Sequence, residues 1–234
     1  MAERMPLVLV PGLLCDAALW RHQAAHLAEV AAITVADVTR QDSMPAMAEA
    51  VLSQAPPGRF ALAGLSMGGY IAFEILRQAP ERIAKVAFLD TSARADTPEQ
   101  TAMRRAQMTL ASQGRLAEVV EQQFPRLVHQ NHRADPALRQ VFTLMAEDVG
   151  AAAFIRQQTA TLGRSDSRST LGSIRCPTLV LVGEDDELTP PERAGEIAAA
   201  IHGARLVTVP QSGHMSTLEQ PDAVARTLLQ WLQA

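Results

Sequence analysis

The chain lacks several features that would point to particular classes of protein. No apolar stretch approaches the roughly 20 residues that a membrane-spanning helix requires. Lysine and arginine number 21 against 25 aspartates and glutamates, a net charge of −4, so nothing favours nucleic acid or an anionic membrane as a partner. The 234 residues contain no internal repeat and no low-complexity tract. These absences favour one large core, or a core with a small appendage.

Cysteine is also scarce, with only Cys15 and Cys176. One follows a predicted strand and the other begins one, so in a parallel sheet they lie about 17–20 Å apart, too far for a disulfide. Arg4 and the apolar residues 6–14 resemble a short secretory signal, but the large Leu13 and Leu14 stand where a cleavage site needs small residues. We therefore expect a mature first strand here and a cytoplasmic protein.

Short apolar segments alternate with amphipathic segments along most of the chain. The predicted strands are 7–10, 33–38, 60–63, 83–89, 178–182 and 206–209. The predicted helices are 16–29, 44–53, 67–79, 191–201 and a closing helix from Pro221. Continuous apolar strands separated by helices predict an α/β fold, with a mostly parallel sheet of about six strands and helices on both faces.

The alternation stops in the middle of the chain. Residues 94–172 contain no convincing strand, and their pattern predicts helices at about 98–113, 116–124, 136–149 and 151–162, followed by a polar connector at 164–169. We therefore expect residues 1–93 and 173–234 to form the α/β core, with 94–172 inserted as a helical lid.

A serine stands where a predicted buried strand gives way to a predicted helix. The five residues are Gly64-Leu65-Ser66-Met67-Gly68. Such a turn pushes the serine hydroxyl out of the backbone, and small residues on both sides are required because strand and helix approach closely. This pattern is typical of a nucleophile elbow and predicts Ser66 as the nucleophile.

A serine hydroxyl needs a base, and the base needs a carboxylate. His214 follows the last predicted strand, and Asp186 follows the strand before it. Asp185 is the nearest rival for the carboxylate, and Asp90 is a more distant one that can instead hydrogen-bond the loop backbone. All these residues follow strands, so all fall at the carboxyl edge of a parallel sheet, where open α/β sheets have their sites.

The oxyanion of such a reaction needs N–H donors already in place. The Met67 N–H lies at the start of the elbow helix. The second donor is expected in the loop after the first strand, at Leu13 with Leu14 as the rival, and Gly12 there allows close approach of the substrate.

The predicted lid offers candidate binding residues. Leu14, Met103, Phe142 and Met145 are the expected substrate contacts, although apolar residues of the lid also suit its own core. Arg104 and Arg105 suit either a substrate carboxylate or a solvated helix face. His129 and His132 stand three apart without a third ligand, so we predict no metal and no cofactor.

These segments carry a resemblance to the α/β-hydrolase superfamily that extends over nearly the whole chain. They are residues 9–16, 64–69, 183–190 and 213–214. The chain looks most similar to small bacterial esterases and to the 3-oxoadipate enol-lactonase-like branch. It differs in having Pro11-Gly12 where many members have His-Gly, and in starting almost at the first strand, without the antiparallel hairpin that often opens the fold.

The residues and the resemblance together predict a serine hydrolase that cleaves a small-molecule carboxylic ester or lactone through an acyl-enzyme intermediate. The alternatives on the same three residues are a C–C bond hydrolase or lyase, a thioesterase and a cofactor-free perhydrolase. A non-catalytic small-molecule receptor is a further alternative. Dehalogenase and epoxide hydrolase chemistry is disfavoured because those relatives carry aspartate at the elbow.

Overall fold

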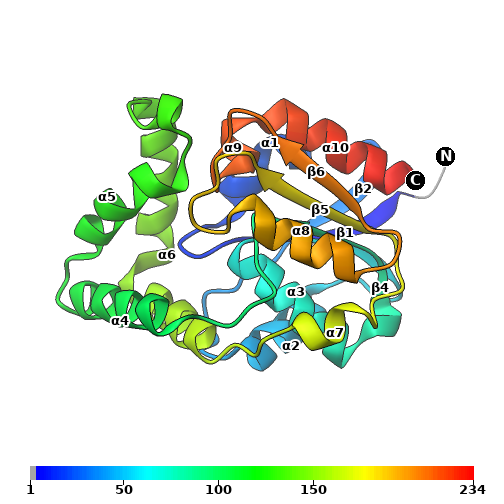
Figure 1. Cartoon of the computed structure of the whole chain (residues 1–234), viewed down its shortest axis with the longest axis horizontal. Coiled ribbons are helices and arrows are strands. Elements are labelled where there is room, and N and C mark those ends of the chain that lie inside the picture. The colour runs from blue at the N-terminus through cyan, green and yellow to red at the C-terminus, as the bar shows by residue number, and fades with distance from the viewer. Residues whose placement is uncertain (1–3) are drawn as a thin grey trace.

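The computed structural model describes residues 4–234, and its centre is one sheet of six parallel strands in the order β2-β1-β3-β4-β5-β6 (Figure 1). The strands are β1 (Met5–Val10), β2 (Ala31–Val35), β3 (Phe60–Leu65), β4 (Ile83–Leu89), β5 (Thr178–Gly183) and β6 (Arg205–Val209). All neighbouring pairs run parallel, so the carboxyl ends of all six lie at one edge. The predicted parallel sheet is confirmed.

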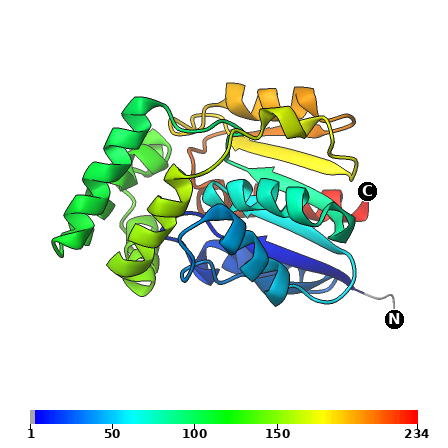
Figure 2. The ribbon, with the colours of Figure 1, turned by 90° about the horizontal axis from the view of Figure 1, so that it is seen from below.

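Helices cover both faces of the sheet (Figures 1 and 2). One face carries α1 (Arg21–Leu27) and α10 (Pro221–Gln233), and the other carries α2 (Met44–Gln54), α3 (Met67–Gln78) and α8 (Pro191–Ala200). Strand β1 shows how the sequence builds both layers, because its side chains alternate between the faces. Leu7 and Leu9 join the hydrophobic cluster under α1 and α10, whereas Val8 and Val10 join the cluster under α2 and α3.

Three helices stand beyond the carboxyl edge of the sheet, at the left of Figures 1 and 2. These are α4 (Pro98–Ser112), α5 (Leu116–Leu127) and α6 (Pro136–Leu162), which follow β4 and precede β5. We refer to them as the lid helices because they occupy the segment that the sequence predicts to be a lid. Gly150, at φ 74° and ψ 165°, breaks α6, so the two helices predicted on either side of it are two arms of one bent helix. Only glycine reaches this backbone conformation without strain.

Several boundaries differ from the predictions for local reasons. The first predicted helix is divided into a 3₁₀ turn, Ala17–Trp20, and α1, and Asp16 caps the turn through the Ala18 N–H at 2.7 Å. Helix α5 extends beyond its predicted end at residue 124 and includes Pro125 in its last turn. Two short helices were not predicted, α7 (Arg168–Leu171) within the expected polar connector and α9 (Ser216–Glu219) after the last strand.

Both cysteines are free thiols, as predicted. Among residues 4–234, none of the helices combines the length and the apolar character needed to cross a membrane.

Candidate active site

Ser66 occupies a strained turn between β3 and α3. Its backbone has φ 54° and ψ −112°, a region that non-glycine residues rarely adopt and that costs about 1–3 kcal/mol. The flanking glycines make the turn possible. A Cβ atom added to Gly64 would lie 2.3 Å from the Gly68 carbonyl oxygen. A Cβ atom added to Gly68 would lie 2.2 Å from the Val10 carbonyl oxygen. Strand, turn and helix therefore fit only with these small residues, and the turn leaves the Ser66 side chain partly exposed.

The structure brings Ser66, His214 and Asp186 into one hydrogen-bonded line. The Nε2 atom of His214 lies 2.8 Å from the Ser66 Oγ, and its Nδ1 lies 2.8 Å from the Asp186 Oδ2. Asp186 and His214 are each only 2% exposed. The imidazole is thus fixed at both nitrogens, with the carboxylate accepting at one side and the hydroxyl held at the other.

The loop after β5 holds the Asp186 carboxylate in place. Its Oδ1 accepts the N–H groups of Leu188 at 2.8 Å and Thr189 at 2.9 Å, and its Oδ2 accepts the Thr189 hydroxyl at 2.7 Å. Thr189 also lies 3.2 Å from the His214 Nδ1. Sequence reasoning missed Thr189, because a threonine three residues after an aspartate is common in loops and gives no specific signal.

The charges around His214 act on its pKa in opposite directions. Burial disfavours the imidazolium, but the nearby carboxylates of Asp186, Asp90 and Glu219 outweigh it and raise the pKa of His214 above its ordinary 6.5. The histidine is therefore well suited to take up a proton, and Asp186 makes the largest favourable contribution.

The two rival carboxylates have other partners. Asp185 lies 3.1 Å from the His129 Nε2 and is largely exposed. Asp90 is fully buried, and its carboxyl group accepts the Gly183 N–H at 2.9 Å and the Ser216 hydroxyl. Burial together with the charge of Asp186 raises the pKa of Asp90 to about 8. Asp90 therefore ties the β5 loop to α9 and does not contact the imidazole.

The predicted oxyanion donors differ in their availability. Within residues 4–234, the N–H groups of Leu13 and Met67 have no hydrogen-bond partner. The Leu14 N–H, the rival donor, is bonded to the Gln157 Oε1 at 3.1 Å. Leu14 therefore does not have a free N–H, and the geometry favours Leu13 over it.

Gln157 is a site residue that sequence reasoning missed. It belongs to α6 and is fully buried, and besides accepting from Leu14 its Nε2 donates to the Val38 carbonyl at 3.3 Å. The side chain thus connects a lid helix to the loop after β1. A lone glutamine inside a helix gives no signal in the sequence, because its partners are 143 and 119 residues away.

Replacement of Gln157 by leucine is expected to lower kcat with little change in KM, because the Leu14 N–H would be left buried without an acceptor and the loop carrying Leu13 would loosen. The unfolding free energy should fall by about 1–3 kcal/mol. Steady-state kinetics and chemical denaturation measure the two effects. Thr159→Ala, at an exposed position of the same helix, is the control. An unchanged kcat in a destabilised variant would show that Gln157 only supports the fold.

Glu219 joins the lid helices to the loop that carries His214. Its Oε1 accepts the N–H groups of Gly213 at 2.9 Å and Met215 at 3.3 Å, and its Oε2 lies 2.6 Å from the His129 backbone nitrogen and 2.9 Å from the His132 Nδ1. The Leu127 carbonyl also accepts the N–H groups of His214 and Met215. The end of α5 and the base therefore share one network.

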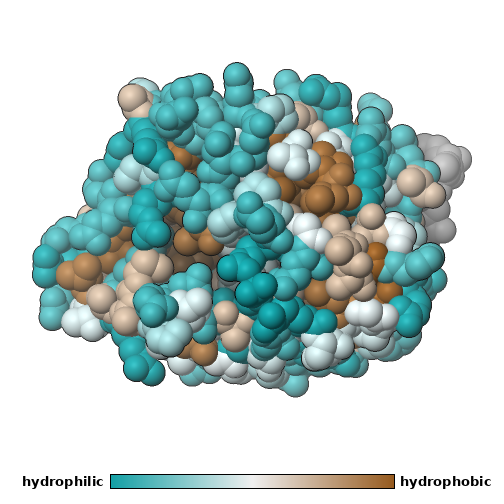
Figure 3. Space-filling view, in the orientation of Figure 1, coloured by the Kyte–Doolittle hydropathy of each residue, from teal (hydrophilic) through white to brown (hydrophobic). Residues whose placement is uncertain are grey.

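An open cavity lies between the lid helices and the sheet edge. Figure 3 shows a hollow there with hydrophobic atoms on its floor. Ser66, His214, Leu13 and Met67 line the cavity, together with the predicted contacts Met103 and Phe142.

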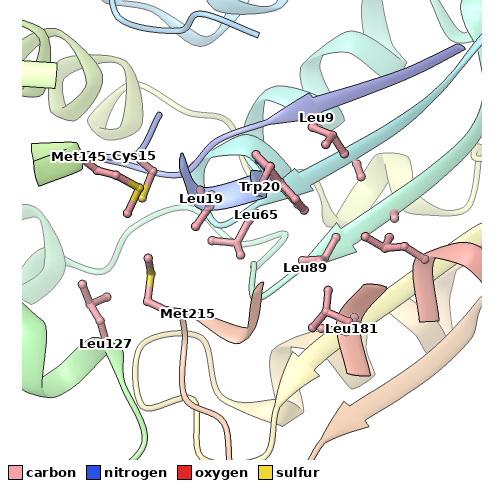
Figure 4. Packing of buried hydrophobic residues seen from close by; sticks show 14 of the residues in the cluster. Leu9, Cys15, Leu19, Trp20, Leu65, Leu89, Leu127, Met145, Leu181 and Met215 are labelled. Carbon is pink, nitrogen blue, oxygen red and sulfur yellow. The ribbon is translucent and has the colours of Figure 1, made fainter. Parts of the chain in front are cut away.

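Two predicted substrate contacts are not at this cavity. Leu14 and Met145 are buried in the hydrophobic cluster of the core and do not line the cavity. Figure 4 shows Met145 beside Cys15 in this cluster. Leu14 turns inward because its backbone, at φ 57°, directs its N–H to Gln157, and Met145 fills space beneath the lid. Leu14 and Met145 are therefore packing residues in the structure and not contacts of the cavity. Cys15 does line the cavity, but burial and the neighbouring Asp16 raise the pKa of its thiol to about 12.

His129 and His132 each pair with a carboxylate, Asp185 and Glu219 respectively. Among residues 4–234, no group of three or more potential ligand side chains is arranged to hold a metal ion.

Comparison with known proteins adds independent findings. The profile of the alpha/beta hydrolase fold matches residues 5–221. Pimeloyl-[acyl-carrier protein] methyl ester esterase of Nitrosomonas europaea is 27% identical over 190 residues, covering 77% of this chain and 74% of that protein.

Solved structures agree with the profile. A thermophilic esterase from Thermogutta terrifontis, with malate bound, superposes with a TM-score of 0.90 at 29% identity over 98% of this chain and 89% of the other. The enol-lactonase from Burkholderia xenovorans LB400 superposes with a TM-score of 0.89 at 22% identity over 100% of this chain and 93% of the other, a likeness of fold alone.

Proposed function

Because the chain belongs to the alpha/beta hydrolase fold family, we propose that it is a serine hydrolase that cleaves a small carboxylic ester or lactone through an acyl-enzyme intermediate. The observation that carries the proposal is the line of contacts from Asp186 through His214 to Ser66, with 2.8 Å at each link. The similarity to the Thermogutta terrifontis esterase supports an ester as the bond that is cleaved.

In the first half-reaction, the Ser66 oxygen bonds to the substrate carbonyl carbon while its proton passes to the His214 Nε2. The negative charge on the former carbonyl oxygen is stabilised by the N–H groups of Leu13 and Met67. His214 then gives its proton to the leaving alkoxide as the carbon–oxygen bond breaks. In a lactone the released alcohol stays attached to the acyl group.

In the second half-reaction, a water molecule gives a proton to His214 and its oxygen bonds to the acyl carbon. The bond to the Ser66 oxygen breaks, His214 returns the proton to that oxygen, and the carboxylic acid leaves. Asp186 stabilises the imidazolium in both halves. Cys15, the only thiol at the cavity within the described chain, is protonated at neutral pH and does not compete as nucleophile.

A fluorophosphonate probe and a substrate panel test the proposal together. We expect the probe to label Ser66, located by peptide mass spectrometry, and we expect turnover of short p-nitrophenyl esters or simple lactones. The panel also contains thioesters, β-diketones and a perhydrolysis assay, so that the alternative reactions on the same residues are measured in parallel. If Ser66 is labelled but only a β-diketone or a thioester is turned over, that compound class replaces the ester as the proposed substrate. A folded sample that is neither labelled nor active would overturn the proposed serine hydrolase function.

A further inference from the structure

The described side chains that line the cavity include positive charges but no negative ones. Arg104 from α4 and Arg126 from α5 line it, and no aspartate or glutamate of the described residues does. Both guanidiniums belong to the lid side, whereas Ser66 and His214 belong to the sheet side. A substrate with its ester at Ser66 would therefore extend toward these arginines.

Arg104 is held in a defined position. Its Nε lies 2.8 Å from the Asp96 Oδ2, and its Nη1 donates to the Gln158 Oε1 at 2.8 Å. The side chain is only 13% exposed. Among residues 4–234, its Nη2 has no hydrogen-bond partner, so a fixed guanidinium edge remains for a ligand. An arginine held in this way binds a carboxylate at low entropic cost.

The acid beside Arg104 does not neutralise the site. Asp96 also pairs with Arg164 at 2.7 Å, so one carboxylate serves two guanidiniums. Burial opposes the charge of Asp96, but Arg164 and Arg104 outweigh it and hold the pKa of Asp96 below its usual range. The group of three therefore keeps one positive charge, and the uncharged Tyr70 ring, whose centre lies 4.3 Å from the Arg164 Cζ, does not neutralise it. A buried unpaired charge is costly, and an anionic ligand would relieve that cost.

Gln107 adds a neutral donor beside Arg104. Its Oε1 accepts from the Gln158 Nε2 at 3.0 Å, and Gln158 is itself fully buried and held by Arg104. Gln107 lines the cavity, and among residues 4–234 its side-chain N–H₂ group has no hydrogen-bond partner. Arg126 contributes a second guanidinium, whose recorded contact is the Met103 sulfur at 3.4 Å. Donors thus outnumber acceptors at this end of the cavity.

We propose that the natural substrate carries a carboxylate in addition to its ester or lactone group, and that Arg104, with Gln107 and Arg126, binds this carboxylate. The inference rests on the proposed function and narrows its substrate class to half-esters of dicarboxylic acids, acyl esters of hydroxy acids, or lactones with a carboxylate side chain. The neutral esters of the same length are the disfavoured class, because they leave the charged end of the cavity unpaired.

Two matched substrate pairs test the proposal. Monomethyl and dimethyl glutarate differ in a charge on the acyl side, and 4-acetoxybutanoate and its methyl ester differ in a charge on the alcohol side. The wild-type chain should favour the anionic member of at least one pair in kcat/KM. Arg104→Gln should lower that preference by about 10- to 100-fold, the value of a lost charge-assisted hydrogen bond. The pair that responds tells which side of the ester faces Arg104.

Arg105→Gln is the matched control, because Arg105 is exposed on the same helix and lies outside the cavity. It should leave the preference unchanged. If Arg104 only supported the lid helices, its replacement would lower kcat/KM for both members of a pair equally. That result, or a wild-type preference for the neutral members, would overturn the proposal.

A binding measurement separates failure of this proposal from failure of the proposed function. Glutarate titrated into the Ser66→Ala variant by calorimetry should bind, and the additional change Arg104→Gln should weaken that binding by about tenfold or more. Glutarate binding that is absent, or unaffected by Arg104→Gln, would overturn the carboxylate site even in an active esterase. Binding with no hydrolysis of any ester or lactone would instead overturn the proposed function alone.

Discussion

Replacement of Ser66 by alanine is expected to lower kcat/KM for p-nitrophenyl butyrate by about 10⁴- to 10⁶-fold, because no other side chain can form the acyl-enzyme bond. The substitution removes one oxygen atom and retains the Cβ, so the strained turn between β3 and α3 remains as it is. The thermal unfolding midpoint should therefore stay within a few degrees of the wild type. Stopped-flow or steady-state release of p-nitrophenol measures the activity over this range.

The fluorophosphonate probe provides the control for that experiment. The alanine variant should take up no label at residue 66 while its circular dichroism spectrum matches that of the wild type. Ester turnover within tenfold of the wild type, in a preparation without labelled contaminants, would exclude Ser66 as the nucleophile. It would also remove the basis for the acyl-enzyme.

Asp186→Asn should lower kcat by about 10⁴-fold, close in size to the effect of removing the nucleophile. The side chain keeps its shape, and its remaining oxygen can still accept the N–H groups of Leu188 and Thr189. The amide cannot stabilise the imidazolium, and it no longer selects the tautomer of His214 that leaves Nε2 free to accept a proton. Asp185→Asn, one residue away on an exposed side chain, should change kcat less than threefold and serves as the control.

The pH profile of kcat/KM gives a second measure of the same substitution. Only the neutral imidazole accepts the serine proton, so activity falls as the pH drops through the pKa of His214. Burial lowers the pKa of His214, but the nearby carboxylates have the larger effect and raise the pKa above 6.5. The acid limb of the wild-type profile therefore lies above pH 6.5. Asp186→Asn removes the largest raising cause, so its acid limb should move to lower pH. A limb that stays in place would show that Asp186 does not act on His214.

The sheet and the elbow could be predicted because their signals are local. The run 83–89 is apolar except for Lys85 and is flanked by turn residues, so β4 appears at the predicted bounds. The elbow needs glycines on both sides of Ser66, and that requirement is visible within five residues. The family resemblance inferred from these motifs is confirmed by the profile match over residues 5–221.

The supporting residues of the candidate site could not be predicted because their partners are distant in the sequence. Gln157 contacts Leu14 across 143 residues of the sequence, and Glu219 contacts His129 across 90. Leu14 and Met145 were expected at the cavity on grounds of residue type alone. Whether an apolar side chain faces the cavity or the core depends on the direction of the backbone. At Leu14 the φ of 57° sets this direction, and residue type does not predict it.

The same distinction applies to the arginines. Arg104 and Arg105 are adjacent in the sequence, yet one lines the cavity and the other faces solvent, because successive helical residues point about 100° apart. The sequence allows two roles for each of these arginines, a contact for a substrate carboxylate or a place on a solvated helix face. The ion pair with Asp96 and the bond to Gln158 are what distinguish Arg104.

The joint between α5 and the loop of His214 has a mechanical consequence. The Leu127 carbonyl accepts the backbone N–H groups of His214 and Met215. The Glu219 carboxylate accepts the N–H groups of His129 and Gly213. If the inserted helices swung open at this corner, the imidazole would be pulled away from the hydroxyl, and the enzyme would be idle while open. The bonds at Leu127 therefore make the alignment of His214 with Ser66 depend on the position of the end of α5.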